Sequence, residues 1–241
     1  MGLRLRVDLL PKAGYADTVV LVDVLRATTT AAVLLERGAR QLLITPSLKT
    51  ARALAERENA LLVGERGGLP PEGFHFGTSP SELISQDFEQ AIVVITTTNG
   101  ATALPAVAGA RTVLLGSLFN ARATVAAALS AATTELAIVC AGREGEEALD
   151  DTLCAGFLAA LAQRGNDACE LQDAAHLAIA VHRSYPDPQE ALWRSQAGRS
   201  LVRLGLQEDL AWSSLISQTE RVPRRTGHEV VLGADVFRFE P

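Results

Sequence analysis

Along the first two thirds of the chain, short apolar runs alternate with stretches in which apolar residues recur at helical spacing. The first pattern is typical of buried strands and the second of helices with one face on a core. Strands are predicted at residues 3–9, 19–23, 41–45, 60–63, 91–96, 112–115 and 136–140. Helices are predicted at residues 28–37, 47–58, 102–107 and 121–131, and Ser47 is the expected N-cap of the second.

Most of these predicted strands are apolar without a break, which indicates that both of their faces are buried. Residues 3–9 differ, because Leu3 and Leu5 alternate with Arg4, so this strand is expected near an edge of the sheet with one face on the core. The alternation of strands and helices predicts the α/β class, with a mostly parallel sheet between helical layers.

From residue 150 onward the pattern becomes mostly helical. Helices are predicted at residues 150–163, 173–182, 189–204 and 207–217, and strands at 230–232 and 236–239. The Tyr-Pro-Asp-Pro sequence at 185–188 is a turn and not a linker. We therefore expect a single domain over residues 1–241, in which residues 166–241 form a helical and strand C-terminal part packed on a core of residues 1–165.

Composition narrows the class of protein. The chain is 48% hydrophobic and 21% charged, as in ordinary globular proteins, and no apolar run is long enough to span a membrane. A net charge of −6 argues against a general nucleic-acid binder. The N-terminal residues do not resemble an export signal, and the odd number of cysteines, three, fits a reducing cytoplasm. Apolar helices at 126–132 and 155–162 leave room for a homo-oligomer interface.

The strongest candidate for chemistry is the end of the predicted strand 19–23, where Asp23, Arg26 and a run of threonines follow four apolar residues. Ligands of open α/β sheets bind at such carboxyl ends. Asp23 could hold Mg²⁺ or attack phosphorus, or it could only bind backbone amides of the turn. Arg26 could grip an anion or pair with Asp23. Thr28 and Thr29 could offer hydroxyls and free amides to an anion, whereas simple capping explains one threonine.

Other predicted strands are also followed directly by polar residues. Glu65 and Arg66 lie between glycines after strand 60–63, although a surface turn would look the same. Thr98, Asn99 and Gly100 follow strand 91–96, where they could donate hydrogen bonds to an anion or simply cap a helix. A weaker candidate of the same kind is Asn120, after strand 112–115.

A further carboxylate, Asp151, opens the helix predicted after strand 136–140. Acidic residues at a helix start need no ligand, but beside a metal site Asp151 could be a ligand or a general base. Together these strand ends predict a site for a metal and an anionic substrate. The candidate catalytic residues are Asp23, Arg26 and Asp151, and the metal would be held by some of Asp23, Glu65 and Asp151. The chain has no P-loop and no Rossmann glycine fingerprint.

A set of motifs in residues 20–156 resembles the 2-phosphosulfolactate phosphatase family. The matching motifs are Val22-Asp23-Val24-Leu25-Arg26-Ala27-Thr28, Gly64-Glu65-Arg66-Gly67-Gly68, Gly73-Phe74 with Gly77 and Ser79-Pro80, Thr97-Thr98-Asn99-Gly100, Ser117 with Asn120-Ala121, and Cys140-Ala141-Gly142 with Asp151 and Ala155-Gly156. The C-terminal third matches more loosely, for example in residues 205–210.

This resemblance implies a three-layer α/β fold, Mg²⁺-dependent phosphatase activity and a link to coenzyme M biosynthesis. It also implies a small anionic substrate, with the arginines and the Thr and Asn turns holding its charged oxygens. Two positions depart from the family's Gly-Phe-Asp-x-Gly-Asn-Ser-Pro loop, since His75 replaces the acid and Thr78 the amide. The alternatives are a phosphatase with a drifted substrate, a non-catalytic binder of sulfonated or phosphorylated metabolites, and a phosphotransferase or lyase.

Overall fold

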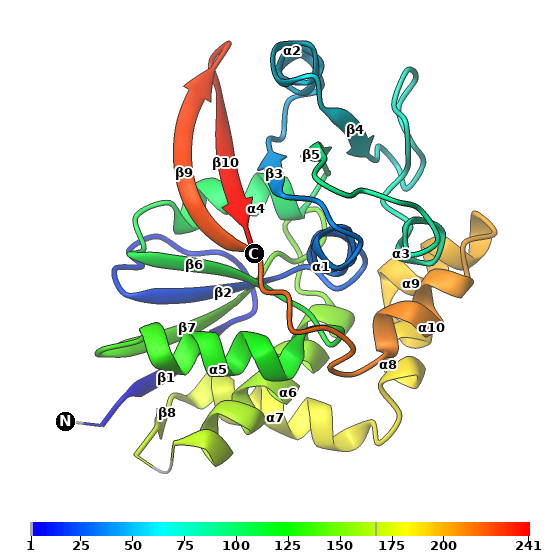
Figure 1. Ribbon diagram of the computed structural model, residues 1–241. Coiled ribbons are helices and arrows are strands. Elements are labelled where there is room, and N and C mark those ends of the chain that lie inside the picture. The colour runs from blue at the N-terminus through cyan, green and yellow to red at the C-terminus, as the bar shows by residue number, and fades with distance from the viewer. Residues whose placement is uncertain (1, 167) are drawn as a thin grey trace.

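The computed structural model describes residues 2–166 and 168–241 (Figure 1). Its strands are β1 (Arg4–Asp8), β2 (Thr18–Val22), β3 (Gln41–Ile44), β4 (Leu61–Gly64), β5 (Ile92–Thr96), β6 (Thr112–Gly116), β7 (Glu135–Cys140), β8 (Glu170–Leu171), β9 (Arg224–Val231) and β10 (Ala234–Glu240). Its helices are α1 (Ala27–Glu36), α2 (Leu48–Glu58), α3 (Pro80–Leu83), α4 (Gly100–Val107), α5 (Ala121–Ala131), α6 (Leu149–Gly165), α7 (Asp173–Ser184), α8 (Pro188–Arg194), α9 (Gln196–Arg203) and α10 (Glu208–Ser214).

The strands of the described residues form one sheet in the order β4-β5-β3-β10-β9-β6-β2-β7-β1-β8. β4, β5 and β3 are parallel, and so are β6, β2, β7, β1 and β8. The predicted α/β class with a mostly parallel sheet is confirmed. The short strand β8 forms the edge beside β1, so the expectation that the first strand lies near an edge is also confirmed.

Between the two parallel groups lies an antiparallel hairpin, β9 and β10, drawn in red in Figure 1. β10 pairs with β3 along three residues, whereas β9 meets β6 at a single pair. Phe237 and Phe239 of β10 are fully buried. The sequence predicted strands here but not their position, so the C-terminal part does more than pack on the sheet, because it supplies two of its central strands.

Side chains of β2 show how the layers arise. Val19 and Leu21 point into an apolar cluster with α1 and α4, while Val20 and Val22 point into another with α5, α6 and α7. Because successive residues of a strand face opposite sides, an unbroken apolar strand buries both. Helix α2 covers β3, β4 and β5 in a third cluster. The result is the expected three-layer arrangement.

One predicted helix is wrong. Residues 189–204 form two helices, α8 and α9, which are separated at Ser195. Ser195 has an extended backbone, and its hydroxyl accepts a hydrogen bond from the Gly198 N–H at 2.9 Å, as an N-cap does. Helical periodicity continues across this break, so the apolar pattern alone does not reveal it. The short elements α3 and β8 were not predicted either.

The two apolar helical segments expected at a subunit interface differ in their surroundings. Within residues 155–162 most side chains are buried, and α6 packs there on α7 and α5. That segment is therefore part of the core and offers no free face. Residues 126–132 of α5 and the following turn keep exposed and half-buried positions.

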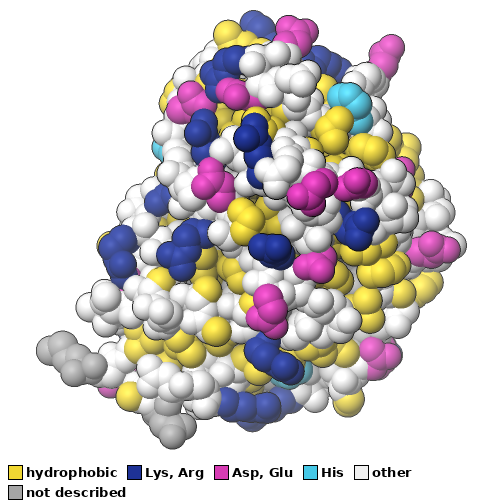
Figure 2. All heavy atoms as spheres, viewed as in Figure 1, with side chains coloured by type: hydrophobic (Ala, Val, Ile, Leu, Met, Phe, Trp, Pro, Cys, Tyr) yellow, Lys and Arg dark blue, Asp and Glu magenta, His cyan; other side chains and the backbone are white. Residues whose placement is uncertain are grey.

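On the face seen in Figure 2, basic and acidic side chains are interspersed, without a continuous area of one sign. Within the described part of the chain, no helix combines the length and the hydropathy needed to cross a bilayer.

Candidate active site

A cavity of about 300 Å³ opens at the carboxyl ends of the parallel strands. Its lining comes from the segments that follow β2, β4, β5 and β7 and from helix α9. The lining residues are Asp23, Leu25, Arg26, Glu65, Gly67, Gly68, Thr98, Asn99, Arg143, Glu144, Ala197, Ser200, Leu201, Arg203 and Leu204. Both the position and the size are those of a site for a small ligand.

Asp23 follows β2 directly and is 5% exposed. Its Oδ1 accepts a hydrogen bond from the Ala27 N–H at 3.3 Å. Burial, and after it the negative charge of Asp150, raises the pKa of Asp23 to about 7, although the backbone N–H groups of Ala27 and Gly100 act in the opposite direction. Asp23 is therefore a buried acid that can exchange a proton near neutral pH.

Gly100, the first residue of α4, lies against Asp23. A Cβ at this position would lie 2.5 Å from the Cβ of Ala27 and 2.6 Å from Asp23 Oδ2. Only glycine allows the helix start to come this close, which brings its backbone N–H to the carboxyl. Thr98 and Asn99, just before it, line the cavity.

Glu65 follows β4 and connects two of the loops that surround the cavity. Its Oε1 accepts a hydrogen bond from the Thr98 N–H at 2.6 Å, and its Oε2 accepts one from the Gly68 N–H at 2.9 Å. Gly68 has φ +88°, a conformation that side chains rarely adopt. The carboxylate is thus fixed by backbone donors while it lines the cavity.

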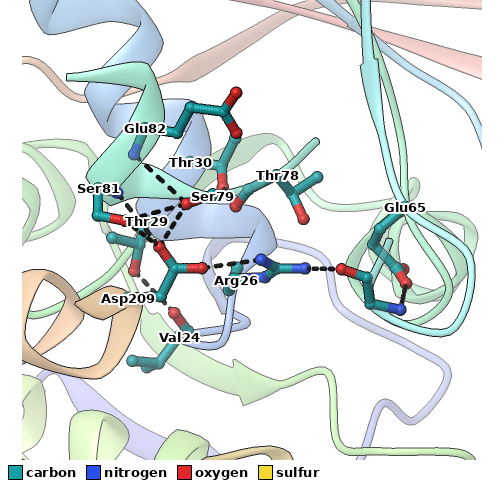
Figure 3. A network of polar contacts seen from close by, with 11 residues as sticks. Val24, Arg26, Thr29, Thr30, Glu65, Thr78, Ser79, Ser81, Glu82 and Asp209 are labelled. Atoms are coloured by element: carbon teal, nitrogen blue, oxygen red, sulfur yellow. Dashed lines mark hydrogen bonds and ion pairs between the residues drawn. The ribbon is translucent and has the colours of Figure 1, made fainter. Parts of the chain in front are cut away.

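Arg26 lines the cavity, and its guanidinium is held from two sides (Figure 3). Nη1 donates to Asp209 Oδ2 at 2.8 Å, and Nη2 donates to the Gly68 carbonyl at 2.6 Å. Both members of the Arg26–Asp209 pair are almost completely buried. The sequence-based alternative for Arg26 was an ion pair with Asp23, but its partner in the structure is Asp209 of α10.

Asp209 is itself saturated with hydrogen bonds. Its Oδ1 accepts from Ser79 Oγ at 2.6 Å and from Ser81 Oγ at 2.7 Å, as Figure 3 shows. Through this one carboxylate, α10 is joined to α3 and to the segment between β2 and α1. No sequence pattern marked Asp209, although it lies in the loosely matching stretch 205–210.

Two arginines on another wall of the cavity share one hydroxyl. Arg143 Nη2 donates to Ser200 Oγ at 3.2 Å, and Arg203 Nη2 donates to the same oxygen at 2.9 Å. Arg143 follows β7, in a strand-end segment of the kind that the sequence analysis searched, whereas Ser200 and Arg203 lie on α9, where no sequence signal marked them.

Asp151 and its neighbour Asp150 open α6, and both are buried. Asp151 Oδ1 accepts from the Val24 N–H at 2.9 Å and its Oδ2 from the Gly142 N–H at 3.0 Å, so it joins the ends of β2 and β7. Asp150 Oδ1, in contrast, is buried and has no hydrogen-bond partner among the residues that the structure describes. Burial raises the pKa of both carboxyls.

The other predicted substrate-binding residues lie outside the cavity lining. Thr28 Oγ1 donates to the Asp23 carbonyl and Thr29 Oγ1 to the Val24 carbonyl, each at 2.9 Å. Arg66 donates to the carbonyls of Glu65 and Pro46.

Asn120 is fully buried, and its amide bonds the backbone of Ser117 and Leu115. It therefore stabilises the segment after β6, which contributes no residue to the cavity lining, whereas Thr28, Thr29 and Arg66 stabilise loops that do.

The two residues that depart from the family's loop pattern also lie away from the cavity lining. His75 is exposed, and its Nδ1 accepts a hydrogen bond from the Leu62 N–H of β4 at 2.9 Å. Thr78 is buried, and its carbonyl accepts from Thr30 Oγ1 at 2.7 Å. Neither position therefore alters the cavity wall directly.

The expected set of three metal ligands is not formed. Among residues 2–166 and 168–241, no three carboxylate, imidazole or thiol groups lie close enough together to hold a metal ion. Asp151 is separated from Asp23 and Glu65, because it does not line the cavity that these two residues share and instead joins the ends of β2 and β7. Asp23 and Glu65 do share the cavity, and Asp150 has an unpartnered buried oxygen. One or two carboxylates suffice for Mg²⁺ where water and phosphate oxygens complete its shell, so the donor set fits this ion.

Taken together, the fold and the cavity define an α/β protein with a candidate small-ligand site at the carboxyl ends of its parallel strands. Residues 5–228 match the 2-phosphosulpholactate phosphatase family, so the chain belongs to that family and to its class, the phosphoric monoester hydrolases. The resemblance stated from the sequence is thereby confirmed.

Relatives in three bacteria are each named probable 2-phosphosulfolactate phosphatase. The chain is 46% identical to the protein of Thermus thermophilus over 225 residues, which cover 92% of this chain and 94% of the relative. It is 43% identical to that of Deinococcus radiodurans over 235 residues, 96% and 98% of the two chains. For Carboxydothermus hydrogenoformans the identity is 34% over 224 residues, 91% and 92%.

Proposed function

We propose that this chain hydrolyses 2-phosphosulfolactate to sulfolactate and inorganic phosphate. The observation that carries the proposal is the cavity itself, in which a buried acid, Asp23, and a fixed guanidinium, Arg26, lie at the strand ends. The names of the relatives and of the family support the choice of substrate. The reaction breaks the ester P–O bond and transfers a proton to the leaving hydroxy acid.

Arg26 is suited to bind the phosphoryl group. A guanidinium has five N–H donors, and the contacts to Asp209 and Gly68 use one on each terminal nitrogen. The remaining donors can bind phosphoryl oxygens in a fixed, forked geometry. Asn99 and Thr98, beside it on the cavity wall, add a carboxamide and a hydroxyl. Donors that are already in place stabilise the charge that develops on the phosphoryl oxygens.

Asp23 is the proposed reacting group. As a nucleophile it would form an Oδ–P bond and release the hydroxy acid, and water would then break that bond. As a general acid or base it would instead exchange a proton with the leaving oxygen or with an attacking water.

We include Mg²⁺ in the proposal, held by Asp23 and Glu65. When bound, it would supply positive charge to the phosphoryl oxygens. Glu65 is fixed by the N–H groups of Thr98 and Gly68, so a second carboxylate stands ready without rearrangement. A cytoplasmic location and, as the resemblance implies, a role in coenzyme M biosynthesis belong to the same proposal, and the free thiols of Cys140, Cys154 and Cys169 agree with a reducing compartment.

Phosphate release tests the function. The purified chain is incubated with 2-phosphosulfolactate and Mg²⁺, with and without EDTA, and phosphate is measured. Release that EDTA abolishes and Mg²⁺ restores is the expected result. If no phosphate appears while sulfolactate still raises the melting temperature, the chain is a binder and the proposal fails. Products other than inorganic phosphate would indicate a phosphotransferase or a lyase.

A covalent trap separates the two roles of Asp23. Labelling in ¹⁸O-water is not sufficient, because a phospho-aspartate that is cleaved at phosphorus gives labelled phosphate and an unlabelled enzyme, as direct attack by water does. Rapid acid quenching and mass spectrometry of the peptide that contains Asp23 then detect the covalent phosphate directly. A mass increase of one phosphoryl group supports the nucleophile, and an unmodified peptide during turnover supports activated water.

A further inference from the structure

Ser200 holds two guanidinium groups together at the cavity. Its single hydroxyl oxygen accepts a hydrogen bond from Arg143 and another from Arg203, and all three residues line the cavity. We call Arg143 and Arg203 the arginine pair. Two positive charges that share one hydrogen-bond acceptor repel each other, and they do so more strongly near a protein surface than in bulk water. An arrangement of this kind becomes favourable when an anion lies between the charges.

Protein carboxylates do little to compensate this charge. Within the described residues, the ion pair of Arg143 is with Glu144 at 3.8 Å, and that carboxylate is 72% exposed. No ion pair of Arg203 occurs in the same part of the chain. Arg26, in the same cavity, is by contrast neutralised by the buried Asp209. The positive charge available to a ligand is therefore concentrated at the arginine pair.

Hydrogen bonds hold the backbone that carries each of the two arginines. Arg143 lies in a tight turn in which it exchanges two backbone hydrogen bonds of 2.9 Å with Glu146. Asn99 Oδ1 accepts from the Glu144 N–H at 3.2 Å, which ties this turn to the segment after β5. Arg203 lies on α9, whose start is fixed by the Ser195 cap. The backbone that carries both arginines is therefore in place before a ligand binds.

We propose that Arg143, Ser200 and Arg203 form the binding site for the sulfonate group of the substrate. This inference rests on the proposed function, since it names the group of that substrate that this wall of the cavity recognises. A sulfonate is always ionised and has three equivalent oxygens, so two guanidinium forks can share it. Guanidinium is weakly hydrated and holds anions by fixed donors, which suits a weakly basic anion better than an ammonium would.

The carboxylate of the substrate is a less suitable occupant. It is attached to the carbon that bears the phosphate, and so it stays beside the phosphoryl end at Asp23 and Arg26. The sulfonate is attached one carbon further along and reaches another wall of the cavity. In this arrangement the strand ends bind the phosphoryl group. The turn after β7 and helix α9 bind the sulfonate and so distinguish 2-phosphosulfolactate from other phosphorylated acids.

Paired substrates test this assignment. We compare 2-phosphosulfolactate with 2-phospholactate, which has a hydrogen where the former carries the sulfonate, in the wild type and in Arg143→Gln and Arg203→Gln. Each variant is expected to raise KM for 2-phosphosulfolactate at least tenfold, equivalent to about 1.4 kcal/mol, with a smaller change in kcat. The loss of kcat/KM should be at least tenfold greater for the sulfonated substrate than for the other.

Arg199→Gln is the matched control, because Arg199 is an exposed arginine of the same helix that does not line the cavity. It should leave both substrates within about twofold of the wild type. Arg203→Lys keeps the charge but loses the fork, and it should recover only part of the preference for the sulfonate. Equal losses for both substrates, or no loss for either, would overturn the assignment while leaving the phosphatase proposal intact.

Calorimetric binding of sulfolactate separates the two proposals further, because it requires no turnover. The wild type and Arg199→Gln should bind it alike, and Arg203→Gln should bind at least tenfold more weakly. This result supports the sulfonate site even if no phosphate is released from any substrate, in which case only the proposed activity fails. Unchanged binding by Arg203→Gln, or no binding by the wild type, overturns the sulfonate site.

Discussion

At Gly100 a single methyl group is enough to disturb the site. A Cβ there would overlap the side chains of Ala27 and Asp23, both of them buried. We expect Gly100→Ala to displace the Asp23 carboxyl and lower kcat/KM for phosphate release about tenfold to a hundredfold. Overpacking should also reduce the free energy of unfolding by about 1–3 kcal/mol, measured by chemical denaturation.

Gly109→Ala provides the control for this prediction. Gly109 lies in the turn after the same helix, and the nearest atom to an added Cβ is the Tyr15 carbonyl oxygen at 3.4 Å. Its activity should match the wild type. If Gly100→Ala keeps full activity and stability, then α4 can move away from Asp23 at no cost and the tight contact is unimportant.

Residue by residue, the sequence predicted the cavity better than it predicted the contacts. Asp23, Glu65 and Asn99 were recognised because polar residues after apolar strands must meet at one edge of a parallel sheet. Whether a hydroxyl faces a ligand or a carbonyl depends on the turn around it, and Thr28 faces the carbonyl. In the same way, two adjacent aspartates look alike in the sequence, so it does not predict that Asp151 accepts backbone N–H groups whereas Asp150 Oδ1 has no partner among the described residues.

At the scale of elements, α10 is joined to the active site through Asp209. Replacing it by Asn removes the charge that neutralises Arg26 and weakens the bonds from Ser79 and Ser81. Loss of one partner of a buried ion pair typically costs about 3–5 kcal/mol. We therefore expect Asp209→Asn to lower the free energy of unfolding by about that amount, and kcat/KM at least tenfold, because the Arg26 guanidinium loses its fixed position.

Glu208→Gln is the neighbouring control, since Glu208 is exposed in the first turn of α10. It should change stability by no more than about 0.5 kcal/mol. Denaturation curves and phosphate release of the two variants are compared side by side. Near-identical behaviour would mean that the ion pair contributes neither to the docking of α10 nor to the position of Arg26.

The elements themselves follow from apolar periodicity wherever strands and helices alternate. Helix α5 was predicted with its observed bounds, 121–131, and α2 with its serine cap. The break in residues 189–204 could not be predicted, because it depends on the hydroxyl of Ser195 turning back to the Gly198 N–H. The position of β9 and β10 in the middle of the sheet could not be predicted either, because the sequence of a hairpin does not show which other strands it will pair with.

At the scale of the whole molecule, this hairpin connects the two parallel halves of the sheet, so its core residues should matter more than its position at the chain end suggests. Phe239 is fully buried and lies opposite Leu42 of β3, whereas Val230 of the same hairpin is 65% exposed. We expect Phe239→Ala to cost about 3–5 kcal/mol in thermal or chemical unfolding, and Val230→Ala less than about 0.5 kcal/mol. A mild effect of Phe239→Ala would show that the two halves hold together without the hairpin.

Asp17 links three further segments of the molecule and should make its stability depend on pH. Its Oδ2 accepts hydrogen bonds from the backbone N–H groups of Thr133, Thr134 and Glu135, and its Oδ1 accepts from Arg111. Burial acts to raise the pKa of Asp17, but these donors outweigh it and hold the pKa far below its usual range. The charged carboxylate thereby joins the start of β2 to the segments before β6 and β7.

The sign of the pH effect follows from that depressed pKa. The stabilising contribution is fully present above the unfolded-state pKa of about 4, and it is lost progressively as pH falls below that value. We expect Asp17→Asn to lower the free energy of unfolding by about 2–3 kcal/mol at pH 7 and by clearly less at pH 2.5, measured by denaturation at a series of pH values. Arg111→Gln should cost no more than about 1 kcal/mol, since that arginine is 52% exposed. The same loss of free energy of unfolding in Asp17→Asn at pH 7 and at pH 2.5 would contradict a contribution from the charge. A contribution from the ionised carboxylate must decrease in acid, because the unfolded chain then binds a proton at this residue.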